Sequence, residues 1–326
     1  MPERDRIERL NEALQGPTLE DAARFDREIR ALAALARRLR HMPRAAFRLK
    51  LRNELEEKAM TIVTESAAVP LREGFHSLTP YIIVPGAARF IGFLQEVFGA
   101  EEKLRVPARE PDRIMHAEVR IGDSMIELSD GNPEHPPRPA SIHVYVPETD
   151  AVYRRALDAG ATSLHPVEEM PYGERSGSVR DPFGNHWYIA TYHGPSHIPE
   201  GLRSINSYLH PVGAGNLIDF LKQAFGAEEV EVYRPDAEGP IVHAKIRLGD
   251  TILEMGEAHG AYPPKPTGLH FYVPDVDAAY RRALEAGAAS ISPPADQPYG
   301  ERGAGIRDPA GNSWFLATPL TAKRGL

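Results

Sequence analysis

The chain has 326 residues, of which 42% are hydrophobic and 26% charged, and this suits two or three globular domains. Its formal net charge of −8 argues against a nucleic-acid partner. The absence of cysteine excludes disulfides, zinc–thiolate sites and thiol nucleophiles. The N-terminal residues lack the apolar core of a secretory signal, and no run reaches transmembrane length. We therefore expect a cytoplasmic protein with no membrane partner.

Residues 1–64 form a segment rich in Arg, Leu, Ala and Glu. An apolar stripe at helical spacing follows the expected N-cap Thr18, and Pro43 separates it from a further helix. The arginines alternate with acidic residues, which favours solvated faces of a helical hairpin over a nucleic-acid contact. These helices are expected to pack on the main body or on a partner, which includes a further homo-oligomer. Residues 65–74 have no periodicity and are expected to be a linker.

An internal duplication dominates the rest of the chain. The stretch 115–128 reappears as 242–255, and each copy has two alternating runs joined by Gly-Asp, the pattern of a tight β-hairpin. The offset of 127 residues holds without insertion or deletion through several other motifs. These motifs in the first copy are Phe98-Gly99-Ala100, His143-Val144-Tyr145-Val146-Pro147, Pro171-Tyr172-Gly173-Glu174-Arg175 and Asp181-Pro182-Phe183-Gly184-Asn185.

The patterns of the first copy predict two βαβββ units joined by a proline-rich bridge at 134–139. Residues 205–318 repeat this order. The clearest elements are strands at 79–84, 141–146 and 186–191, a hairpin at 114–128, and helices at 87–98 and 149–159. Gly99 and Gly160 follow the two helices as expected stops.

These motifs, each present twice and in order, resemble the vicinal-oxygen-chelate (VOC) superfamily, and most closely its PhnB-like glyoxalase/bleomycin-resistance/dioxygenase group. The resemblance covers residues 75–320 and implies an α+β fold of two tandem VOC domains, at 75–194 and 205–320, with a linker at 195–204. In each domain, paired βαβββ units would form an open curved sheet. The two domains would pair within the chain as a pseudo-dimer. The fold hosts isomerases, lyases, dioxygenases and drug-binding proteins, so it leaves the activity open.

Alternation along the strands sorts the side chains of the first domain. Ala117 and Val119 belong to the apolar face, so His116 and Glu118 point to the other side. A two-residue Gly-Asp turn places Glu118 opposite Glu127. We expect an open curved sheet to bring the polar faces of several strands into one cleft. Its members would be Tyr81, His116, Glu118, Glu127, His143, Tyr145, His186 and Tyr188.

Two carboxylates facing each other across a hairpin require a metal ion, a proton or an arginine between them. Nearby imidazoles favour a single divalent ion, whereas Arg120 is the alternative partner. In the VOC superfamily the ligands come from the first, fourth, fifth and eighth strands. The resemblance therefore implies Glu127 and His143 as ligands, and we add His116 because the first and eighth positions hold Thr79 and Tyr188.

The second copy differs in charge. Lys245 replaces Glu118 and is expected opposite Glu254, where it would pair with that carboxylate and repel a cation. We therefore expect a metal ion in the first cleft and none in the second. Glu254 and His270 would lie in the second cleft at the positions equivalent to Glu127 and His143, and His243 and His210 would be hydrogen-bonded wall residues there.

Two classes of function follow. The first is a metal-dependent lyase or isomerase acting on a small oxygenated substrate, with Glu118 as general base. The second is a non-catalytic small-molecule binder of the bleomycin-resistance type, with aromatic walls. Arg175 would grip a substrate anion or, as we favour, form a structural pair with Asp181. A ligand-sensing regulator, suggested only by the extra N-terminal segment, is a third alternative.

Overall fold

The computed structural model describes residues 71–320, apart from 134, 237–238 and 261. The chain divides into two compact units, 1–66 and 67–326, and every described residue belongs to the second. The helices expected within residues 1–64 lie outside the described residues. Among the residues that are described, no helix is long and apolar enough to cross a membrane.

Four βαβββ units follow one another, as the sequence predicted. The first contains β1 (Leu78–Val84), α4 (Ala87–Phe98), β2 (Glu101–Pro107), β3 (Ile114–Ile121) and β4 (Ser124–Asp130). The second contains β5 (Ser141–Tyr145), α5 (Thr149–Asp158), β6 (Thr162–Met170), β7 (Glu174–Arg180) and β8 (His186–Tyr192). The third contains β9 (Ile205–Leu209), α6 (Ala214–Phe225), β10 (Glu228–Tyr233), β11 (His243–Leu248) and β12 (Thr251–Met255). The fourth contains β13 (Gly268–Tyr272), α7 (Val276–Glu285), β14 (Ala289–Asp296), β15 (Glu301–Arg307) and β16 (Ser313–Pro319).

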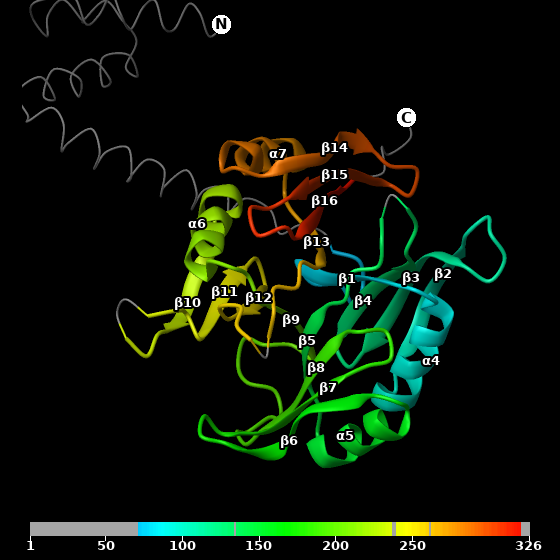
Figure 1. Cartoon of the computed structure of the whole chain (residues 1–326). Coiled ribbons are helices and arrows are strands. Elements are labelled where there is room, and N and C mark those ends of the chain that lie inside the picture. Colours follow the sequence, from blue (N-terminus) through cyan, green and yellow to red (C-terminus); the bar gives the residue numbers. More distant parts are fainter. Residues whose placement is uncertain (1–70, 134, 237–238, 261, 321–326) are drawn as a thin grey trace, which may run out of the picture. The chain divides into compact units, whose positions relative to one another are not determined.

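The units assemble into two eight-stranded sheets. Sheet I has the order β14-β15-β16-β13-β1-β4-β3-β2, and sheet II has the order β10-β11-β12-β9-β5-β8-β7-β6. Sheet I thus joins the first unit to the fourth through antiparallel β1 and β13, and sheet II joins the second to the third through β5 and β9. Figure 1 shows the blue β1 beside β13, although the two strands begin the first and the last of the four units. Each sheet therefore combines halves of both sequence repeats.

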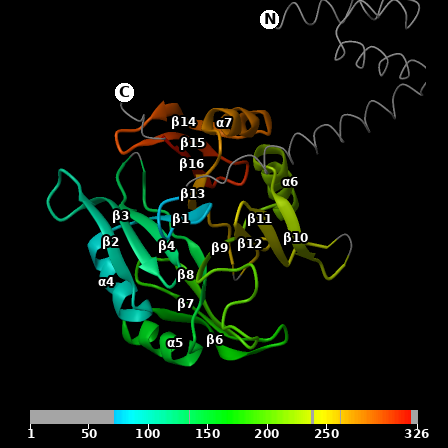
Figure 2. The same ribbon diagram turned by 180° about the vertical axis from the view of Figure 1, so that it is seen from behind.

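The hydrophobic cores, by contrast, follow the repeats. One core extends from Ile82 to Ile205 and contains Phe90 of α4 and Trp187 of β8. The other contains Leu217 of α6 and Trp314 of β16, with Leu78 as its member from the first unit. Helices α4 and α5 lie near each other in the first repeat, and the view from behind in Figure 2 shows both. Each repeat of 75–194 and 205–320 thus buries its own apolar faces while giving half of its strands to each sheet.

The Gly-Asp turns connect the two repeats. The expected two-residue turns are confirmed, because Ile121 pairs with Ser124 and Gly122 has a φ of 59°. Asp123 accepts a hydrogen bond from the backbone of Ser204 at 2.9 Å. In the same way, Asp250 accepts one from the backbone of Ser77 at 2.7 Å. Each turn therefore holds the segment that leads into the other repeat, next to the junction of the sheets.

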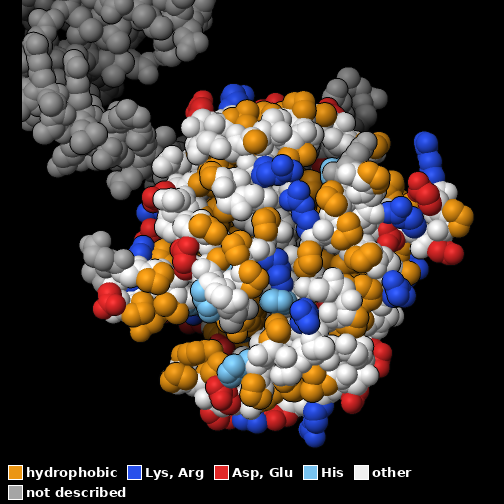
Figure 3. All heavy atoms as spheres, viewed as in Figure 1, with side chains coloured by type: hydrophobic (Ala, Val, Ile, Leu, Met, Phe, Trp, Pro, Cys, Tyr) orange, Lys and Arg blue, Asp and Glu red, His pale blue; other side chains and the backbone are white. Residues whose placement is uncertain are grey.

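On the face drawn in Figure 3, hydrophobic side chains lie among charged ones instead of forming one continuous patch. Such mixing is ordinary for the surface of a folded protein. No apolar patch among the described residues of this face marks a binding site, so the candidate site is identified by its buried charged groups and its cavity.

Candidate metal-binding cleft

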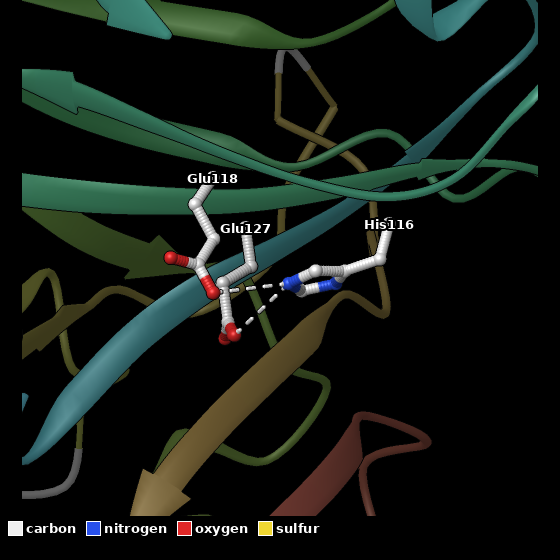
Figure 4. A group of neighbouring side chains, drawn as sticks. All are labelled: His116, Glu118 and Glu127. Carbon is white, nitrogen blue, oxygen red and sulfur yellow. Dashed lines mark hydrogen bonds and ion pairs between the residues drawn. The ribbon is translucent and has the colours of Figure 1, made fainter. Parts of the chain in front are cut away.

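The β3–β4 hairpin gathers His116, Glu118 and Glu127 on the concave face of sheet I (Figure 4). Glu118 pairs directly with Glu127 in the strand register, as predicted. The Nε2 atom of His116 lies 3.3 Å from Glu118 Oε1 and 3.9 Å from Glu127 Oε1. Donor atoms of the three residues all lie within 4.8 Å of one another. This spacing suits a shared divalent ion, because ligands bonded to one ion at about 2.0–2.2 Å lie close together.

The fifth-strand histidine of this cleft is His270, and not His143 as the sequence resemblance implied. His270 Nδ1 lies 2.5 Å from Glu127 Oε2, whereas His143 belongs to sheet II. The physical reason is the exchange between repeats, which places β13 beside β1 in the position expected for β5. His186, Tyr145 and Tyr188, which were expected in the same cleft, are likewise in sheet II. We call the site around Glu127 cleft I and the equivalent group of side chains around Glu254 cleft II.

Arg72, from the segment expected to be a linker, is the cation that faces the carboxylates of cleft I. Its Nη1 donates a hydrogen bond to Glu118 at 2.7 Å, and its Nη2 lies 3.9 Å from Glu127 Oε1. Its Nε lies 4.0 Å from Glu301, which also accepts a 2.7 Å hydrogen bond from Tyr272. Arg120, the partner weighed from the sequence, pairs instead with Glu101 at 2.8 Å.

The electrostatics of cleft I favour charged forms despite burial. Burial alone would raise the pKa of Glu118, but hydrogen bonds from His116 and Arg72 hold it below its ordinary value. Burial opposes the charged form of His270, yet the charge of Glu127 raises its pKa above the ordinary value. Desolvation would lower the pKa of Arg72 as well, but the hydrogen bonds of Arg72 to Tyr272 and Glu118 outweigh this effect and raise the pKa above its ordinary value. Cleft I therefore holds negatively charged carboxylates next to positively charged side chains.

A cavity of about 1110 Å³ opens over these groups. Tyr81, Phe315 and Tyr299 contribute aromatic surface to its wall. The rings of Tyr81 and Phe315 lie 5.1 Å apart, and burial raises the pKa of Tyr81 to about 12. Of the two family ligand positions that lack a metal ligand, Thr79 is buried on β1 and the eighth-strand position of this cleft is Phe315. The wall of the cavity is thus mostly apolar, as in small-molecule sites, and charged groups line it both beside Glu127 and at the β2–β3 loop, where Arg109, Glu110 and Arg113 lie.

Cleft II repeats the buried frame with different surroundings. His143 Nδ1 lies 2.9 Å from Glu254 Oε2, and Tyr145 donates a 2.7 Å hydrogen bond to Glu174. Lys245 pairs in register with Glu254, as predicted, but its ammonium group forms its ion pair with Glu231 at 3.2 Å. The expected Lys245–Glu254 ion pair is therefore wrong, because the flexible side chain turns to the neighbouring strand β10.

Aromatic side chains contact one another in cleft II. The rings of Tyr188 and Tyr208 lie 5.2 Å apart, and His210 stacks on Tyr262 at 5.2 Å. The hydroxyl group of Tyr188 also lies 2.8 Å from His210 Nε2. Desolvation, with the charges of Lys265 and Arg180, lowers the pKa of His186 to about 4. His243 Nε2 lies 3.8 Å from Glu254, so it belongs to the wall of cleft II as expected.

The contacts of Arg175 are ion pairs within its own unit, which is a structural role. It pairs with Asp150 of α5 at 2.5 and 2.8 Å and with Glu169 at 3.2 Å. The expected partner Asp181 is instead buried and accepts a hydrogen bond from Trp187 at 2.9 Å. The preceding residue in the sequence, Glu174, is the one whose side chain lies in cleft II, where it accepts the hydrogen bond from Tyr145. That residue, Glu174, and its repeat Glu301 were missed by the sequence reasoning, although the duplication retains both.

Comparisons with known proteins agree with this architecture. Residues 74–189 and 215–316 match the Glyoxalase/Bleomycin resistance protein/Dioxygenase superfamily, which is more than half of the chain. The chain belongs to this family, the VOC superfamily expected from its motifs.

Individual relatives and solved structures extend the comparison. An uncharacterized protein of Mycobacterium bovis is 37% identical over 125 residues, which cover 35% of this chain and 81% of the relative. Glyoxalase I of Zea mays is 16% identical, with a TM-score of 0.56 over 74% of this chain and 92% of its own. A putative dioxygenase of Bacillus subtilis is 15% identical, with a TM-score of 0.51 over 75% of this chain and 85% of its own. At these identities the two solved structures support the fold alone.

Proposed function

We propose that this chain is a metal-dependent lyase or isomerase that acts on a small oxygenated substrate in cleft I. The proposal depends on one observation, the grouping of donor atoms from His116, Glu118 and Glu127 within 4.8 Å beside a cavity of about 1110 Å³. One imidazole and two carboxylates are ligands suited to several divalent ions. These three residues would hold the ion, and His270 would orient Glu127 through its 2.5 Å contact.

When bound, the ion would supply a Lewis acid that polarises oxygen atoms of the substrate. Glu118 was expected to be the general base, but it belongs to the donor group, and its lowered pKa weakens it as a base. We therefore assign proton acceptance to Glu301, a carboxylate of the same cavity outside that group. The 2.7 Å hydrogen bond from Tyr272 fixes one oxygen of Glu301, and the other, which lies 3.9 Å from His270 Nε2, would accept the substrate proton.

The metal content of the purified full-length chain tests the proposal. Wild type should contain about one equivalent of a divalent ion, the Glu127→Gln variant should lose it, and the matched Glu254→Gln variant of cleft II should retain it. Elemental analysis after incubation with nickel, manganese, iron or zinc salts measures this. A wild type that holds no ion under any of these conditions would contradict the metal-dependent function.

A non-catalytic small-molecule binder is the second candidate, and the apolar cavity favours it. Tyr81, Tyr299 and Phe315 provide aromatic surface that needs no metal to hold a ligand. A binder should keep its affinity for apolar ligands in the Glu127→Gln variant, since the aromatic wall is unchanged. An enzyme that requires the ion should lose turnover there. Ligand screening by thermal shift, with wild type and variant side by side, separates the two.

A further inference from the structure

Arg72 lines the same cavity as the donor group and contacts both of its carboxylates. Its Nη1 lies 2.7 Å from Glu118 Oε1, and His116 Nε2 lies 3.3 Å from that same oxygen. Its Nη2 lies 3.9 Å from Glu127 Oε1, the other oxygen that faces His116. The guanidinium group thus contacts both carboxylate oxygens that the donor group offers.

An arginine and a divalent ion cannot share these oxygens at low cost. An ion must lie about 2.0–2.2 Å from each oxygen that it binds, which places it beside the guanidinium group. The two cations would repel each other, and Glu118 Oε1 would serve both at once. Arginine remains charged at every physiological pH, so the repulsion cannot be relieved by loss of a proton.

The local structure lets the side chain leave while its backbone stays. Phe75 is buried against Met125 and Tyr272 and anchors the segment. The Arg72 side chain itself is 44% exposed, and its guanidinium carbon lies 4.1 Å from the centre of the Phe75 ring. A long exposed side chain on a fixed base can turn toward solvent without unfolding the segment.

The duplication provides an internal comparison. Leu71-Arg72-Glu73-Gly74-Phe75 corresponds at the 127-residue offset to Ile198-Pro199-Glu200-Gly201-Leu202. Leu202 is buried beside Tyr145 as Phe75 is beside Tyr272, so the anchor is the same in both repeats. The arginine is replaced by Pro199, which carries no charge. The cation at position 72 is therefore a property of cleft I and not of the anchoring segment.

We infer that Arg72 competes with a divalent ion for Glu118 and Glu127 and so sets the metal affinity of cleft I. This inference rests on the proposed function, because it concerns the same donor group. Binding of an ion requires the guanidinium to turn away from the carboxylates, and loss of the ion lets it return. The buried carboxylates are then paired in both states, with the ion when it is bound and with Arg72 when it is absent, and only ions that bind strongly enough to displace Arg72 occupy the site.

To test this inference, the full chain is first treated with a chelator to remove bound ions. It is then titrated with zinc or nickel salts alone, and isothermal calorimetry measures the affinity. Arg72→Gln should bind the ion at least about tenfold more tightly than wild type, the lower end of effects produced by residues next to metal ligands. Arg72→Lys keeps the charge and should remain close to wild type. Arg120→Gln removes an arginine of the same hairpin that pairs with Glu101, and should also match wild type. Circular dichroism confirms that each variant is folded.

The outcomes distinguish the inference from the proposed function. Equal or weaker binding in Arg72→Gln, with a wild type that does bind, would overturn the inference and leave the proposed function standing. Binding in Arg72→Gln but not in wild type would support the competition and reject the proposed metal-dependent activity of the natural chain. If no variant binds zinc or nickel, the inference is overturned, and the proposed function is rejected as well when manganese and iron also fail to bind. Adding Glu127→Gln to Arg72→Gln should abolish the gain, and a gain that persists would place the ion elsewhere and overturn the inference.

Discussion

Clefts I and II are built on one frame and differ in what surrounds it. In each, a buried glutamate of the hairpin contacts a histidine of the central strand, at 2.5 Å for Glu127 and His270 and at 2.9 Å for Glu254 and His143. In each, a tyrosine hydroxyl donates a 2.7 Å hydrogen bond to a second buried glutamate. The repetition of these contacts across an exchanged pair of sheets indicates that the frame is a structural feature shared by both repeats.

The differences lie in the side chains around the frame. Cleft I has Glu118 on its hairpin and Arg72 above it, and cleft II has Lys245 and Pro199 at the equivalent positions. Ile83 of cleft I corresponds to His210 of cleft II. Cleft I thus has one more acid in its hairpin and a movable cation, while cleft II has a lysine that pairs with β10 and stacked rings. A duplicated frame can therefore carry one charged site and one aromatic site.

The largest effect should come from exchanging the hairpin charge. Lys245→Glu gives cleft II the same donor types as cleft I, and His243 Nε2 already lies 3.8 Å from Glu254. Cleft II has no arginine at the position of Arg72. In a Glu127→Gln background, where cleft I is disabled, Lys245→Glu should raise zinc affinity on the order of 100-fold, as measured by calorimetry.

A surface exchange of the same charge controls for the change in net charge. Lys222 pairs with Glu229 on an exposed surface, so Lys222→Glu in the same background should leave zinc affinity unchanged. If Lys245→Glu also leaves it unchanged, the hairpin charge is not what separates the two clefts.

The sequence was sufficient for the elements of the four units and for the registers of the two Gly-Asp hairpins. A strict 127-residue repeat of apolar alternation, glycine stops and Gly-Asp turns determines local structure, and the pairing of Glu118 with Glu127 follows from turn length alone. The buried faces of the strands were likewise set by alternation. The superfamily followed from the order of motifs, and the match over both copies confirms it.

Which halves share a sheet was beyond the sequence pattern. Because the repeats match at every motif, β1 could accept β5 or β13 as a neighbour with nearly the same side chains, and both choices bury the same apolar faces. Which of these strands pairs with β1 depends on long-range contacts such as that of Asp250 with Ser77, and no local sequence pattern specifies such contacts. His143 was therefore placed beside Glu127, and Arg72, in a segment without periodicity, was not considered.

A second prediction uses a titrating residue that cleft I lacks. Desolvation lowers the pKa of His210 to about 4, from about 6.5 in an unfolded chain. The unfolded state therefore takes up a proton as pH falls below about 6.5 while the native state does not, so stability is lost from there down to about pH 4. His210→Ile, which installs the residue of position 83, should reduce this loss by about 1–3 kcal/mol.

Denaturant unfolding at several pH values between 7.5 and 4 measures the difference between wild type and variant. His165→Gln removes an exposed histidine that contacts Glu168, and should leave the pH profile of wild type nearly unchanged. Parallel profiles for wild type and His210→Ile would show that His210 is protonated at no cost to the fold.

The smallest effect is expected at the repeated arginines. Arg175 pairs with Asp150 and Arg302 with Asp277, in each case between the start of a strand and the helix of the same unit. Exposed ion pairs contribute little to stability, so Arg175→Gln and Arg302→Gln should each lower the free energy of unfolding only slightly, and by equal amounts. Neither change should alter metal or ligand affinity, because both guanidinium groups are engaged by carboxylates of their own unit. A loss of ligand affinity in one variant alone would show that its cleft uses the arginine to hold an anion, and would make the arginines a further difference between the clefts.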